Sequence, residues 1–133
     1  MRATLHKLLL QIVFFIGVIT ILSGAGQMLF PELVLQLIGG EISPGGNHSF
    51  AIIGMFMTLF GALCIAALST EHQEPVAIFW CSLQKLGASI AVWLGVTKGL
   101  FSPLALLVAG FDGFSFVVML IFWFSIRTRK NFM

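Results

Sequence analysis

The chain has 133 residues, of which 59% are hydrophobic and only 9% are charged, and its formal net charge at pH 7 is +2. A soluble domain averages about 25% charged residues. The 7 Lys and Arg and 5 Asp and Glu of this chain are too few to cover the surface of a soluble protein of this size. The composition therefore excludes a soluble enzyme, a nucleic-acid-binding protein and a small secreted domain held by disulfides. The small net charge gives no reason to expect a polyanionic partner.

The apolar residues form four long runs, a pattern that is typical of a polytopic membrane protein. We place the four spans at about residues 8–30, 50–68, 76–96 and 102–126. Each run has roughly 20 residues, the length that a helix rising about 1.5 Å per residue needs to cross a hydrocarbon core of ~30 Å. The sequence therefore predicts an all-α fold, in which a bundle of four transmembrane helices forms one domain over residues 1–133.

The first run has a second interpretation, as a cleaved signal peptide. Arg2 and Lys7 precede it, and the small residues Ser23-Gly24-Ala25 resemble a cleavage site. The hydrophobic segment nevertheless continues to Phe30. This continuation favours a retained transmembrane span.

Between the first two spans, residues 31–38 are expected to form a short helix at the membrane interface. Pro31 suits the first position of a helix, and Gly39-Gly40 ends the segment. In a helix, the apolar side chains fall on one side, namely Leu33, Val34, Leu37 and Ile38. An apolar side opposite a polar one is typical of a helix that lies on a membrane surface.

The Lys and Arg residues near the span ends predict the orientation. One side of the membrane would carry five of them, and these are Arg2, Lys7, Arg127, Arg129 and Lys130. The other side would carry only Lys98. Because cytoplasmic segments are enriched in Lys and Arg, we expect a multi-pass protein of the bacterial inner membrane with both termini in the cytoplasm.

Two ionisable residues, Lys85 and Asp112, lie inside the predicted spans. Both come to rest roughly 15 Å deep, near the middle of the bilayer, where a charge costs about 2.5–3.5 kcal/mol on insertion scales. Both side chains should therefore point into the bundle. Because the connection at residues 97–101 is short, the third and fourth spans are antiparallel neighbours, and an ion pair between the two side chains is expected.

The neighbours of these two residues on the helix faces support close packing. Ser82 and Ser89 share a face of the third span with Lys85, and Ala105 and Ala109 share a face of the fourth with Asp112. Beside them runs a row of small residues, Gly87, Ala91 and Gly95, for which we predict contact with another helix.

Three interpretations of the charged pair remain open. It holds two helices in register, it serves as a proton or ion relay or a polar substrate pocket, or its members pair with another subunit.

The histidines and cysteines do not form a pattern that is typical of a haem, metal or catalytic site. His6, His48 and His72 fall in the termini or loops, so haem ligation by this chain alone is not expected. Cys64 and Cys81 lack nearby His or acidic residues and are interpreted as packing residues. We predict no metal site, and no arrangement of nucleophile and base indicates a catalytic residue.

Several short motifs resemble the DoxX-like group of small bacterial membrane proteins. They are Gly54 and Gly61 in the second span, Leu83-Gln84-Lys85-Leu86-Gly87 in the third, and Ser102-Pro103 followed by Gly110-Phe111-Asp112 in the fourth. Such relatives often have an Arg shortly before the first of these glycines, where this chain has His48-Ser49-Phe50-Ala51. The resemblance implies a fold and a compartment. Some members are associated with quinone-linked respiratory complexes.

These observations leave two candidate functions. An enzymatic role is less favoured than either of them. The first is a non-catalytic accessory or assembly subunit of a membrane complex, with a respiratory complex as one candidate. The second is a small proton-coupled transporter or permease that uses Lys85 and Asp112. The expected partners are the lipid bilayer and other membrane subunits or a second copy of the chain, but no nucleic acid. No cofactor is predicted, and a quinone or a lipid is the ligand class left open.

Overall fold

The computed structural model describes residues 1–132, which form five helices and no strand. The helices are α1 (Arg2–Leu29), α2 (Pro31–Ile38), α3 (Pro44–Ser69), α4 (Pro75–Thr97) and α5 (Ala105–Asn131). Four of them, all except α2, are long and apolar enough to cross a membrane. The predicted all-α fold with four candidate spans and a short helix between the first two is therefore confirmed.

Proline and glycine mark the ends of several helices. Pro31, Pro44 and Pro75 each occupy the first turn of a helix, where the missing N–H costs no hydrogen bond. The start of α3 is also capped, because the Gly46 N–H donates to Ser43 Oγ at 3.0 Å. At the end of α2, Gly39 adopts the left-handed conformation with φ 70°, which a residue without a side chain reaches most easily.

The fourth long helix begins later than predicted, at Ala105 rather than Ser102. The preceding residues form a tighter turn, in which the N–H groups of Ala105 and Leu106 donate to the carbonyls of Ser102 and Pro103, both at 3.0 Å. The apolar pattern alone does not distinguish this turn from a helical first turn.

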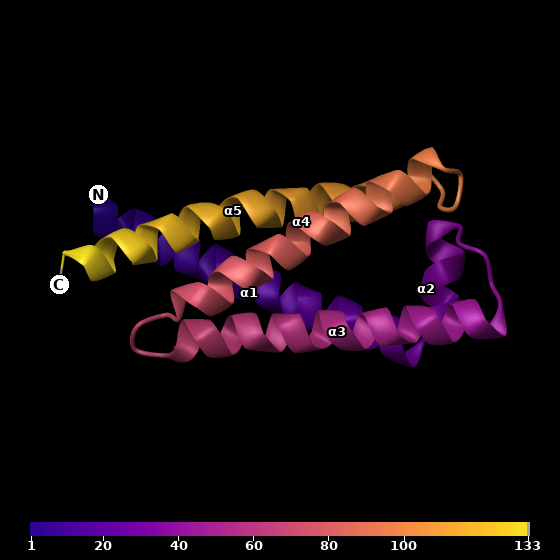
Figure 1. The fold of residues 1–133 in the computed structure, drawn as a ribbon, viewed down its shortest axis with the longest axis horizontal. Helices are drawn as coiled ribbons and strands as arrows, with labels where there is room; N and C mark the ends of the chain where they lie inside the picture. Colours follow the sequence, from indigo (N-terminus) through magenta and orange to yellow (C-terminus); the bar gives the residue numbers. More distant parts are fainter. Residues whose placement is uncertain (133) are drawn as a thin grey trace.

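The long helices form two hairpins. α1 packs mainly on α3, and α4 packs mainly on α5, whereas contacts between the two hairpins are fewer. Figure 1 shows that α3 and α4 lie close together at the end where residues 70–74 connect them and diverge toward the opposite end. Both termini lie at the end where the hairpins meet.

At the end where the hairpins diverge, α2 links them. It runs across the direction of the long helices (Figure 1), and its Leu35 side chain is buried. The Ile38 carbonyl accepts a hydrogen bond of 2.8 Å from the Ser102 N–H, which belongs to the connection before α5. Leu33 and Leu37 are exposed, as expected for side chains that contact lipid.

The apolar core lies toward the other end, where all four long helices contribute to it. Its most completely buried large side chains are Val13 from α1, Ile78 from α4, and Met119 and Phe122 from α5. The core therefore holds the two hairpins together near the termini. Lys85 lies next to this core, because it lines a small cavity together with the core residues Ile16 and Met119.

Candidate functional site

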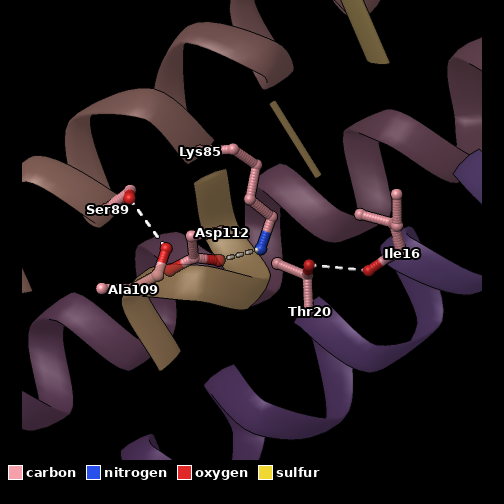
Figure 2. Close-up of polar contacts among 6 residues, drawn as sticks. All are labelled: Ile16, Thr20, Lys85, Ser89, Ala109 and Asp112. Atoms are coloured by element: carbon pink, nitrogen blue, oxygen red, sulfur yellow. Dashed lines mark hydrogen bonds and ion pairs between the residues drawn. The ribbon is translucent and has the colours of Figure 1, made fainter. Parts of the chain in front are cut away.

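The structure brings Lys85 of α4 and Asp112 of α5 together. Lys85 Nζ donates to Asp112 Oδ1 at 2.9 Å, and the two side chains are only 4% and 5% exposed. Figure 2 shows the lysine side chain extending from α4 toward the carboxylate on α5. α4 and α5 are antiparallel neighbours because a short connection joins them. This arrangement places Lys85 of α4 opposite Asp112 of α5.

A second bond ties α4 to α5 one turn away from the pair. Ser89 Oγ donates to the Ala109 carbonyl at 2.7 Å, as drawn in Figure 2. Ala105 and Ala109, the small residues that share a face of α5 with Asp112, are both buried. Ser82 is buried as well, but its hydroxyl donates to the Phe79 carbonyl of its own helix at 2.6 Å and not to the ion pair.

Two further side chains surround the lysine ammonium. The ring of Phe111 has its centroid 5.3 Å from Lys85 Nζ, within the range of a cation–π contact. Thr20 of α1 is buried, and its side chain lies beside the ammonium in Figure 2 while its hydroxyl donates to the Ile16 carbonyl at 2.7 Å. The sequence assigned neither residue to this site, although a Thr in the middle of an apolar span is a signal that could have pointed to Thr20.

A small cavity adjoins the ion pair where the two hairpins cross. Its volume is about 10 Å³, and Thr20, Gln84 and Lys85 supply polar groups to its lining. A cavity needs roughly 10–15 Å³ to hold one water molecule. The site can therefore accommodate a single water at most, and in this conformation it has no room for a quinone or a comparable organic substrate.

Ser115 is a buried polar residue that the sequence analysis missed. It lies on α5 one turn from Asp112 and is fully buried, and its hydroxyl has no hydrogen-bond partner. Its spacing of three residues from Asp112 places it on the same side of the helix. This spacing is the signal that could have identified it.

The predicted packing row on α4 is not covered by another helix of this chain. Gly87 and Ala91 are exposed, and the space beside Gly87 is open. Gly95 is buried, but the group nearest to it is the ring of Phe101 in the connection to α5. The reason is geometric, because α4 contacts α5 through the face that carries Lys85. Gly87 follows Lys85 by two residues, so it lies on nearly the opposite side of the helix.

The two cysteines lie in the core. Cys64 of α3 and Cys81 of α4 are free and buried, and both line the small cavity near Lys85. Cys81 Sγ lies 3.6 Å from the Phe60 carbonyl. Over residues 1–132, no group of three or more His, Cys, Asp or Glu residues is arranged to hold a metal ion.

Comparison with known proteins adds no family, since no protein-family model, curated protein or solved structure matches the chain. The DoxX-like resemblance thus rests on its short motifs. In the structure, these motifs supply the ion pair through Lys85 and Asp112, and the contact between α1 and α3 through Gly54 and Gly61.

Proposed function

We propose that this protein is a non-catalytic accessory or assembly subunit of a complex in the bacterial inner membrane. The observation that carries this proposal is the outward face of α4. Gly87 and Ala91 leave that face almost flat at its centre, and no helix of this chain covers it. In a bilayer, small residues on an open helix face allow another transmembrane helix to approach closely.

The burial of the four long helices supports the same proposal. In its most apolar 18-residue stretch, α5 is 39% buried within the chain, whereas α4 is only 22% buried. Along the outward face of α4, bulky exposed residues flank the small ones on both sides, with Trp80 toward one end and Leu94 toward the other. A partner helix that fits between them would bury a face that the chain itself leaves open.

In this proposal the ion pair has a structural role. Lys85 and Asp112 fix the register of α4 against α5, and the bond from Ser89 to Ala109 reinforces it. The pair thereby stabilises the fold, and it makes no contact with the partner, which would bind the outward face of α4 instead. The DoxX-like resemblance adds a respiratory complex as the candidate assembly. The excess of Lys and Arg at the end with both termini supports a cytoplasmic location for that end.

A variant series with an internal control tests this proposal. Gly87→Leu and Ala91→Leu should each reduce the subunits that co-purify with the tagged protein in mild detergent. Gly110→Leu is the matched control, because Gly110 of α5 is also exposed and also has open space beside it. The proposal fails if quantitative mass spectrometry finds the same co-purifying subunits for all three variants and the unmodified protein.

A proton-coupled transporter or permease is the second candidate, and one observation favours it. The Lys85 ammonium has three N–H donors, and Asp112 is the only hydrogen-bond acceptor that it meets within residues 1–132. The adjoining cavity has space for one water molecule at this point. In this function a proton would pass through the pair, so proton-driven uptake by reconstituted vesicles should be measurable and should be lost in Lys85→Met.

A further inference from the structure

A groove lies between the start of α1 and the end of α5. Both of these segments lie at the end of the molecule where the two termini are found (Figure 1). Its volume is about 780 Å³, and both helices line it. It exists because α1 and α5 make few contacts with each other, whereas each packs closely on its hairpin partner. The ion pair and the outward face of α4 contribute no residue to this groove.

The lining of the groove changes along its length. Arg2 and Arg129 stand at its outer end, and Leu9 and Ile121 line it further in. These apolar residues lie seven to eight positions from the two arginines, which is about 10–12 Å along a helix. The groove therefore has a cationic mouth at its outer end and an apolar wall further in.

The wall near the mouth is ordered by contacts within the protein. The His6 ring stacks on the Phe122 ring with the centroids 5.5 Å apart, and His6 Nδ1 lies 3.5 Å from Ser125 Oγ. His6 and Ser125 both line the groove, as do Phe124 and Thr128. The groove is thus formed by side chains that already pack on one another.

Among the described residues 1–132, no carboxylate lies within ion-pair distance of either arginine at the mouth. Over residues 1–132, the pair between Lys85 and Asp112 is the only salt bridge. Glu71 lines a neighbouring hollow together with Arg129 but forms no ion pair with it. Arg127 is placed differently, because its guanidinium lies over the Trp123 ring, 5.1 Å from the centroid, and outside the groove.

We propose that the groove between α1 and α5 binds an anionic phospholipid. The guanidinium groups of Arg2 and Arg129 would hold the phosphate, since Arg forms bidentate hydrogen bonds with phosphate oxygens. One acyl chain would lie along the apolar wall formed by Leu9 and Ile121. Basic pockets between transmembrane helices on the cytoplasmic side are suited to anionic headgroups, and the cytoplasmic leaflet is rich in them.

The test measures lipid retention by the purified full-length chain in detergent. Native mass spectrometry should show phosphatidylglycerol bound more tightly than phosphatidylcholine of the same chain length. Because each of the two arginines would make charge-assisted hydrogen bonds to the phosphate, Arg2→Gln with Arg129→Gln should weaken phosphatidylglycerol binding by about 25-fold or more. The matched control, Arg127→Gln with Lys130→Gln, removes two charges from the same end of the molecule and should retain the lipid.

Three results would overturn the proposal. Equal weakening by the two double variants would show non-specific attraction to a basic surface. Inorganic phosphate that displaces phosphatidylglycerol at similar concentration would show an anion site with no role for the acyl chain. Equal retention of phosphatidylcholine would show that the arginines do not select the headgroup. Because Arg2 and Arg129 are exposed, circular dichroism should show that the variants keep their helical content.

Discussion

Gly24 of α1 and Gly54 of α3 meet backbone against backbone. A side-chain carbon added to Gly24 would lie 2.7 Å from the Gly54 carbonyl oxygen, and one added to Gly54 would lie 2.6 Å from the Gly24 carbonyl oxygen. Two turns away, a carbon added to Gly61 would lie 2.9 Å from the Gly17 carbonyl oxygen. The backbones of α1 and α3 therefore approach closely through glycines spaced about two turns apart on each helix.

Gly24→Ala should destabilise the protein, because the atoms that the added methyl group would meet include backbone atoms that cannot move aside. Overpacking of this kind costs about 1–3 kcal/mol. Thermal unfolding in detergent measures the effect. Gly26→Ala is the control on the same helix, since nothing lies within 4 Å of the position that its methyl group would occupy. Equal stability of the two variants would mean that α1 and α3 do not approach as closely as the structure shows.

The sequence was sufficient to predict the spans and the positions of Lys85 and Asp112, because both follow from the cost of placing polar groups in lipid. It was not sufficient to predict which small residues face another helix. The row of Gly87, Ala91 and Gly95 has spacing as suitable for helix packing as that of Gly17 and Gly24. Which of the two rows contacts another helix depends on how the two hairpins pack against each other. The periodicity of a single helix does not predict this packing.

Gly87→Leu should leave the unfolding temperature of the isolated chain unchanged, because its side chain would extend into open space. The same substitution should reduce association with a partner helix if the outward face of α4 is an interface. A lower unfolding temperature of the isolated chain would instead indicate that Gly87 packs within the chain.

Ser89 and Ser115 form a matched pair of hydroxyl groups near the ion pair. Ser89→Ala removes a bond from α4 to α5 and should cost about 0.5–1.5 kcal/mol of unfolding free energy. Ser115→Ala removes a buried hydroxyl that has no partner, so stability should stay the same or increase. Detergent unfolding of both variants checks this. Equal destabilisation by the two substitutions would show that the Ser115 hydroxyl does have a partner in the membrane.

The orientation can be tested with a reporter that is active only in the periplasm. Fused to the C-terminus, it should be inactive, because five of the six Lys and Arg residues near the span ends lie on the side of the termini. Inserted after Lys98, in the connection between α4 and α5, it should be active. The reverse pattern would contradict the proposed topology.

The ion pair itself is tested by a double-mutant cycle. Lys85→Met and Asp112→Leu should each destabilise the protein by about 3–5 kcal/mol, because each leaves a buried charge without its partner. The double variant should recover much of that loss, since no charge then remains to be buried. A double variant as unstable as the single variants would show that each charge has another partner.

The central claim is that the pair is structural in an accessory subunit, and the Lys85→Met, Asp112→Leu double variant tests it most directly. The measurement is the amount of high-molecular-weight complex that contains the tagged protein, resolved by native electrophoresis of mild-detergent extracts. Our account predicts the same amount for the double variant and the unmodified protein, because the outward face of α4 is retained. A double variant that is as stable as the unmodified protein but absent from the complex would contradict the account.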